Sequence, residues 1–191
     1  MSALVGIFVG GKSTRMGSAK GLLAAPGSTK VLVQRLVDEA RAALPDAECV
    51  LVGQRAEYDP LDLVALPDAR ADCGPLGGLV ALLLEARSRG HDAAYALACD
   101  MPYLSRASIA QLASFALDAD VVAPRRDERW EPLAARYAPV PCLPLAQARL
   151  AAGDFSLQGL LRALGERCRE IELPAAELDD WDSPSDVSAP R

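Results

Sequence analysis

Continuous apolar runs alternate with helical patterns along this chain. Because the runs do not alternate with polar residues, they predict strands that are buried on both faces of a sheet. In the first half, strands are expected at residues 3–9, 49–52 and 93–99. Helices are expected at residues 31–44 and 75–90. Pro75 suits the first turn of the second helix. Between these elements, residues 59–73 are expected to form a loop rich in proline and aspartate.

The second half of the chain has a less regular pattern. Ser105 can cap a helix that continues to Leu117. Further strands are expected at residues 120–123 and 133–137, helices at 143–152 and 157–164, and an edge strand at 170–173. Repeated strand-helix-strand units predict an α/β fold, a mostly parallel sheet with helices on both faces. Such sheets bind ligands at the carboxyl ends of their strands.

Composition narrows the classes of function. With 191 residues, a 51% hydrophobic content and a net charge of −6, the chain is expected to fold as one domain and to bind no nucleic acid. The longest apolar stretch, around residues 79–84, falls well short of the ~20 residues that span a bilayer, and a cytoplasmic location is expected. Five widely spaced cysteines indicate neither a disulfide framework nor a zinc site. The single histidine, His91, lies in a polar connection and offers little to a triad mechanism.

Positive charge gathers around a glycine-rich segment at residues 10–20. Lys12, Arg15 and Lys20 accompany glycines whose backbone amides can approach a ligand, which predicts an anion site for a nucleoside triphosphate. Residues 6–13 also match the G-x-x-x-x-G-K-[ST] pattern of P-loop kinases and ATPases. That motif would place buried strand residues in a loop, so we favour a strand that ends at Val9 and a long loop that wraps the phosphates. A solvated loop is the remaining alternative.

Aspartates in two segments of the chain are candidates for ligand binding. Asp100 follows a buried strand, so its carboxylate is expected at the ligand edge of the sheet, where it can bind Mg²⁺. A turn or capping role, or a Walker B role beneath a P-loop, is the alternative. Asp68 and Asp72 precede Cys73-Gly74-Pro75-Leu76. A carboxylate there can accept two hydrogen bonds from guanine, whereas cytosine offers no such donor pair. The alternative is that both aspartates are charges on a surface loop.

The segment Gly10-Gly11-Lys12-Ser13-Thr14-Arg15-Met16-Gly17-Ser18-Ala19-Lys20 resembles the signature of the molybdenum cofactor guanylyltransferase family, which are nucleotidyltransferases. The resemblance implies a Rossmann-like, three-layer nucleotidyltransferase fold. It divides residues 1–191 into a nucleotide half, about residues 1–104, and an acceptor half, about 105–191. The guanylyltransferase branch has Leu-Ala-Gly-Gly where this chain has Phe8-Val9-Gly10-Gly11, while the cytidylyltransferase branch has alanine at the position of Gly10. The resemblance therefore favours GTP.

Transfer of GMP from GTP to the terminal phosphate of molybdopterin, with release of pyrophosphate, is the activity that the resemblance implies. Mg²⁺ is the expected cofactor and Asp100 its ligand, because residues 99–102 are similar to the family's metal-binding segment. The expected catalytic residues are Arg15, Lys20 and Asp100. The expected nucleotide-binding residues are Phe8, Val9, Gly10, Gly11, Lys20, Asp68 and Asp100.

Other functions stay open from the sequence. They are a cytidylyltransferase or another nucleotidyltransferase with a different acceptor, a P-loop kinase, and a module that binds nucleotide without chemistry. Expected partners are GTP and molybdopterin, with molybdoenzymes or cofactor-biosynthesis proteins as further candidates.

The chain departs from the family pattern in places. Gly53 stands where the family often has asparagine. The segment Asp180–Asp186 is similar to the family's Asn-x-Asn-Thr-Pro-x-Asp on the pterin side, but Asp180 and Asp182 replace both asparagines, and the start of a short helix explains the segment equally well. Nearby, Arg125, Arg126 and Arg129 are interpreted as a solvated loop tip, with contact to an anionic pterin as the alternative.

Overall fold

A seven-stranded sheet with the order β3-β2-β1-β4-β8-β5-β9 forms the centre of the computed structural model, which describes residues 2–9, 19–54, 56–181 and 186. The strands are β1 (Ala3–Phe8), β2 (Glu48–Val52), β3 (Ala65–Leu66), β4 (Ala93–Ala98), β5 (Val121–Ala123), β8 (Ala134–Tyr137) and β9 (Cys168–Glu170). β8 runs antiparallel to β4 and β5, while the other neighbours pair in parallel. A separate hairpin joins β6 (Arg125–Arg126) to β7 (Arg129–Trp130). The predicted mostly parallel sheet is confirmed.

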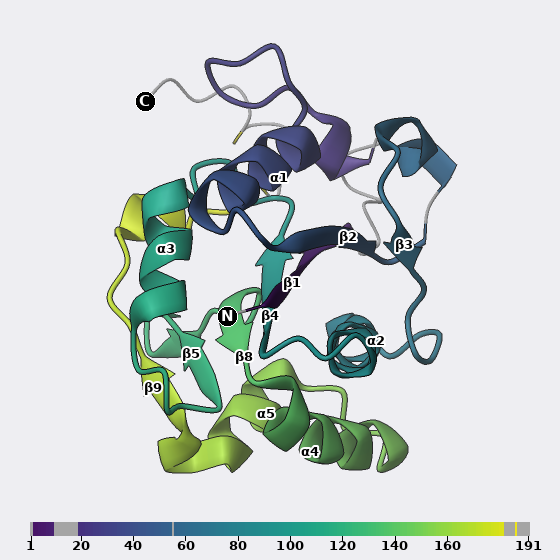
Figure 1. Cartoon of the computed structure of the whole chain (residues 1–191), viewed down its shortest axis with the longest axis vertical. Helices are drawn as coiled ribbons and strands as arrows, with labels where there is room; N and C mark the ends of the chain where they lie inside the picture. The colour runs from purple at the N-terminus through teal and green to yellow at the C-terminus, as the bar shows by residue number, and fades with distance from the viewer. Residues whose placement is uncertain (1, 10–18, 55, 182–185, 187–191) are drawn as a thin grey trace.

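Helices cover both faces of the sheet and complete three layers (Figure 1). They are α1 (Leu32–Ala43) and α3 (Arg106–Ser114) on one face, and α2 (Pro75–Ser88), α4 (Pro139–Ala151) and α5 (Leu157–Leu164) on the other. Alternate residues of β1 enter different cores: Leu4 and Phe8 pack with the α2 side, and Val5 and Ile7 pack with the α1 side. This is why the strand reads as one continuous apolar run.

Several predicted boundaries are wrong, each for a local reason. α3 ends at Ser114 rather than Leu117, since the chain turns through Ala116 at a positive φ of 42° and Leu117 is exposed. α4 begins four residues before the predicted start, with Pro139 in its first turn, where a missing N–H costs nothing. The edge strand is Cys168–Glu170, because Cys168 is the residue opposite Val121 in the ladder. The expected loop 59–73 is partly structured. Its first residues belong to a 3-10 helix, Ala56–Leu61, and β3 lies within it.

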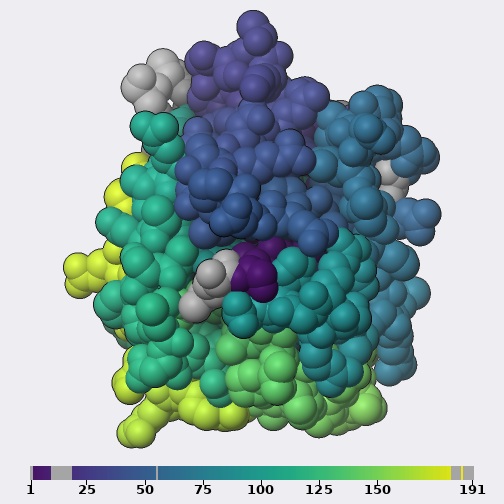
Figure 2. Space-filling model, in the orientation of Figure 1, coloured from purple at the N-terminus to yellow at the C-terminus, as the bar shows by residue number. Residues whose placement is uncertain are grey.

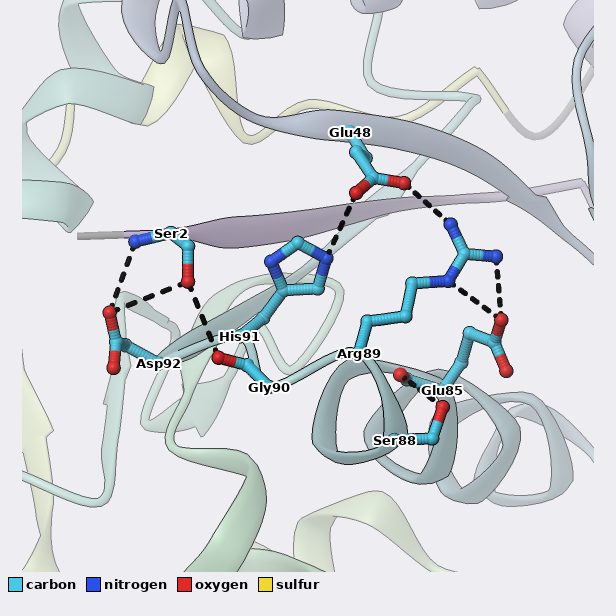
Figure 3. Close-up of polar contacts among 8 residues, drawn as sticks. All are labelled: Ser2, Glu48, Glu85, Ser88, Arg89, Gly90, His91 and Asp92. Carbon is cyan, nitrogen blue, oxygen red and sulfur yellow. Dashed lines mark hydrogen bonds and ion pairs between the residues drawn. The ribbon is translucent and has the colours of Figure 1, made fainter.

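A polar cluster ties together the amino ends of three strands (Figure 3). Asp92 accepts a hydrogen bond from the backbone N–H of Ser2 at 3.0 Å, and Glu48 pairs with both Arg89 and His91. Figure 2 shows this side of the molecule, where the purple start of the chain lies among the blue and teal segments. His91 precedes β4, whereas Asp100 follows it, so the two lie at opposite ends of that strand.

Ser105 caps α3 as predicted. Its Oγ accepts a hydrogen bond from the Ser108 N–H at 3.3 Å and donates one to Glu177 Oε1 at 3.0 Å. Ser114, in the last turn of the same helix, is exposed and only donates back to the carbonyl oxygens of Ala110 and Gln111.

Replacing the capping hydroxyl should therefore cost stability that an exposed one does not supply. We expect Ser105→Ala to lower the free energy of unfolding by about 1–2 kcal/mol, from the loss of the cap and of the Glu177 contact. The control Ser114→Ala should change it by less than about 0.5 kcal/mol. Urea denaturation followed by circular dichroism measures both, and equal effects of the two substitutions would contradict the capping role.

Candidate active site

The two candidate catalytic residues that the structure describes lie in contact. Lys20 Nζ is 3.2 Å from Asp100 Oδ2, and the two side chains are 17% and 26% exposed. Lys20 follows the glycine-rich segment, and Asp100 follows β4. They meet because β1 and β4 are adjacent parallel strands whose carboxyl ends lie at the same edge. Eighty residues of sequence separate two groups that form one site.

Local packing fixes the position of Lys20. It begins a 3-10 helix, Lys20–Leu22, whose Gly21 donates its N–H to the hydroxyl of the buried Tyr58 at 3.2 Å. A Cβ on Gly21 would lie only 2.5 Å from Val33 Cγ2, so only glycine allows this turn to lie so close to α1. The sequence pattern, which indicated a loop from residue 10 to Lys20, revealed neither this 3-10 helix nor the close approach.

The electrostatics of Asp100 are those of a partly buried acid. Burial raises its pKa, and the charge of Lys20 and its hydrogen bond act in the opposite direction. The negative charge of Asp180 raises the pKa further. Since burial comes first among these causes, the ionised carboxylate is less stable here than in water, which is typical of a group held ready for a cation.

The end of β1 places the predicted nucleotide-binding residues Phe8 and Val9 beside Asp100. Both are buried: the Phe8 carbonyl accepts the Cys99 N–H at 3.2 Å, and Val9 donates its N–H to the Val52 carbonyl at 3.0 Å. Because their side chains lie in the core, these two residues can offer a ligand only backbone atoms or the edge of a side chain. The other predicted members of the loop, Gly10, Gly11, Lys12 and Arg15, lie outside the described residues.

The P-loop alternative does not fit this geometry. In that motif the chain leaves the strand at the first glycine. Here Gly6, Ile7 and Phe8 are all buried members of β1, paired on both sides. The strand continues through the residues that would have to form the loop.

Asp68 lies on the same edge of the sheet, near the first turn of α2. A Cβ on Gly78 would lie 3.1 Å from Asp68 Oδ1, 3.0 Å from Phe8 Cε1 and 2.6 Å from Val52 Cγ1. Asp68 is exposed to solvent. Its carboxylate is nevertheless partly desolvated, and this raises its pKa. The carboxylate is therefore accessible to a ligand and partly shielded from water by the neighbouring apolar groups.

Arg70 anchors the Asp68 loop to the far half of the chain, and sequence reasoning missed it. Its Nη1 donates to the carbonyl of Leu150 at the end of α4 at 3.3 Å, and its guanidinium lies 5.8 Å from the centre of the Phe155 ring. An arginine in a loop carries no sequence signal for a helix end eighty residues away.

The β6–β7 hairpin is structured, which corrects the interpretation of its arginines as a solvated loop tip. Arg125 lies over the Trp130 ring at 5.0 Å. Arg126 contacts Glu131 at 3.1 Å, Asp180 at 3.4 Å and Asp179 at 3.5 Å. Arg129 is exposed. A cavity of about 480 Å³ lies beside this hairpin, lined by residues that include Arg126, Arg129, Trp130 and Gln158.

Residues 179–181, which we call the strap, cross from this hairpin to the Lys20–Asp100 pair. The Trp181 N–H donates to the Asp100 carbonyl at 2.9 Å. Its side chain, 6% exposed, packs with Leu23, Ala25 and Leu32 and meets the edge of Tyr103 at 6.4 Å. Of the segment that resembles the family's pterin side, Asp180 pairs with Arg126, Asp186 is helical, and the predicted Asp182 and Ser183 lie outside the described residues.

Metal binding at this edge depends on few protein groups. Within the part of the chain that the structure describes, three or more histidine, cysteine, aspartate or glutamate side chains do not converge as a metal site. A protein of this kind can still hold Mg²⁺, which usually takes one or two carboxylates together with substrate phosphates. Asp100 fits that donor set.

The fold and this site define a nucleotidyltransferase. The chain belongs to the family described as MobA-like NTP transferase domain, whose model matches residues 5–168. It is 34% identical to a probable molybdenum cofactor guanylyltransferase of Opitutus terrae, over 100% of this chain and 96% of the relative. It is also 34% identical to the molybdenum cofactor guanylyltransferase of Pseudomonas putida, over 93% and 92% of the two chains.

Solved structures show the same fold. The crystal structure of molybdopterin-guanine dinucleotide biosynthesis protein A from Archaeoglobus fulgidus superposes with a TM-score of 0.73 and 19% identity, over 98% of this chain and 95% of that one. The predicted nucleotidyltransferase fold is confirmed. Across residues 2–9, 19–54, 56–181 and 186, a helix long and apolar enough to cross a membrane is not found.

The raised pKa of Asp100 predicts the direction in which stability changes with pH. The folded protein holds this proton more tightly than the unfolded chain, so stability falls as the pH rises from the ordinary aspartate range through the raised pKa. Asp100→Asn is neutral at every pH and keeps the shape. We expect it to melt at a higher temperature than the wild type at pH 7, with the difference vanishing towards pH 3.

Thermal melts at both pH values measure the effect. Asp46 is an exposed aspartate, and Asp46→Asn serves as a control that should change stability by less than about 0.5 kcal/mol at either pH. A lower melting temperature of Asp100→Asn at pH 7 would mean that Lys20 more than offsets the burial.

Proposed function

We propose that this protein transfers the GMP unit of GTP to the terminal phosphate of molybdopterin, giving molybdopterin guanine dinucleotide and pyrophosphate. The observation that carries the proposal is the contact between Lys20 and Asp100 at the carboxyl edge of β1 and β4. Membership of the MobA-like family and relatives named as guanylyltransferases support it.

The reaction needs positioning rather than a protein base. An oxygen of the acceptor phosphate, already anionic near neutral pH, forms a bond to the α-phosphorus of GTP. The bond from that phosphorus to the bridging oxygen breaks, and both electrons leave with pyrophosphate. Alignment of the acceptor and neutralisation of the departing charge are the tasks of the site.

Lys20 and Asp100 have complementary tasks in this proposal. Bound at Asp100, Mg²⁺ would neutralise phosphate charge and orient the α-phosphate. The Lys20 ammonium, 17% exposed, would face the phosphates with little competition from water. Arg15 and the backbone of Gly10 and Gly11 are proposed to enclose the rest of the triphosphate.

Asp68 is the residue proposed to recognise the guanine base. It lies beside the end of β1, exposed to a ligand but partly desolvated. A carboxylate accepts the N1–H and the exocyclic N–H of guanine together, and shielding from water strengthens both hydrogen bonds.

A nucleotide panel tests the function. With Mg²⁺ and molybdopterin, we expect pyrophosphate release with GTP in preference to CTP, UTP and ATP, and a product heavier than the acceptor by one GMP unit. Asp100→Asn should lower the turnover rate about a thousandfold, the size of several kcal/mol of lost charge stabilisation. A preference for CTP would assign a cytidylyltransferase instead. Formation of ADP from ATP would assign a kinase. Binding of GTP without release of pyrophosphate would assign a binding module.

Base recognition is tested with inosine triphosphate, which lacks the exocyclic amine of GTP. The wild type should favour GTP over inosine triphosphate by about tenfold, and Asp68→Asn should remove that preference and raise the KM for GTP roughly 10- to 100-fold. Asp72→Asn is the matched control, at a positive φ of 57° that asparagine tolerates. Loss of the preference in Asp72→Asn instead would assign base recognition to the other aspartate.

A further inference from the structure

The strap is held from both sides. On the side of the nucleotide site, Trp181 donates to the Asp100 carbonyl and packs on Leu23, three residues after Lys20. On the other side, Asp179 and Asp180 meet Arg126 of the hairpin. The strap thus joins the hairpin to the Asp100 backbone and to the segment that follows Lys20.

Charge makes the Arg126 contact more than a surface ion pair. Its guanidinium is 32% exposed and faces three carboxylates, those of Glu131, Asp179 and Asp180, which are 16%, 40% and 37% exposed. Without the cation, these three carboxylates would repel one another across a partly desolvated gap. Asp180 adds a third negative charge to this site, and Arg126 lies within 3.4 Å of it.

We propose that Arg126 is a positioning residue for nucleotidyl transfer: by neutralising Asp179 and Asp180, it holds the strap against the segments that carry Lys20 and Asp100. Arg126 acts through the strap and touches neither residue of the pair. The inference rests on the proposed function for its kinetic part and on the strap contacts alone for its structural part.

The kinetic test uses Arg126→Gln, which keeps hydrogen bonding but loses the charge. We expect kcat to fall about tenfold, because a small displacement of catalytic groups is costly. The KM for GTP should change less than twofold, since Asp68 lies on a different loop. Arg126→Lys should recover part of the loss, and Arg126→Gln with Asp180→Asn should recover most of it, because the repulsion is removed.

A fluorescence test follows the strap without any reaction. In a Trp130→Phe background, Trp181 is the remaining tryptophan of the chain. Acrylamide should quench it weakly in the parent, more strongly with Arg126→Gln, and weakly again with Asp180→Asn added. Melting temperatures confirm that each variant is folded.

The matched control is Ser105→Ala, which removes the nearby Ser105–Glu177 contact rather than the charge pairing. Adding Asp180→Asn to that variant should change neither its kcat nor the quenching of Trp181; a higher kcat or weaker quenching there would overturn the proposal. Unchanged kcat and quenching in Arg126→Gln would overturn it as well. A wild type inactive with every nucleotide would defeat the proposed function, while the quenching series would still decide whether Arg126 holds the strap.

Discussion

The ion pair between Lys20 and Asp100 is the interaction around which the rest of the site is arranged. Each partner is held by a different part of the chain: Lys20 by the fit of Gly21 against α1 and Tyr58, and Asp100 by β4 and by the strap. Neither position is determined by nearby sequence alone. The pair exists because β1 and β4 are adjacent in the sheet, so the order of the strands is what brings the two groups together.

This arrangement carries an electrostatic cost at Asp100. Burial disfavours the charge on Asp100 more than Lys20 favours it, and Asp180 adds a second negative charge nearby. Proteins commonly keep such costs at functional sites and offset them in the core. Here the offset comes from two apolar layers, one on each face of the sheet, that bury nearly every residue of the central strands.

The sequence allowed the central part of the fold to be predicted, since β1, β4, α2 and α5 follow simple rules of apolar pattern and capping. It also placed Lys20 and Asp100 in one site. It could not reveal the hairpin, because Arg125, Arg126 and Trp130 form a strand pair that lacks an apolar pattern. Nor could it reveal Arg70 or Trp181 as anchors, whose partners lie about eighty residues away in the sequence.

The reversed direction of β8 has a consequence for how such a chain can change. β5 ends, and β8 begins, at the edge where Lys20 and Asp100 meet, so the intervening residues 124–133 leave and re-enter the sheet at the same rim. Residues inserted or deleted there would reshape this rim while the strand pairs of the sheet stayed in register. One antiparallel strand thus lets this connection change in length without a shift of register in the sheet.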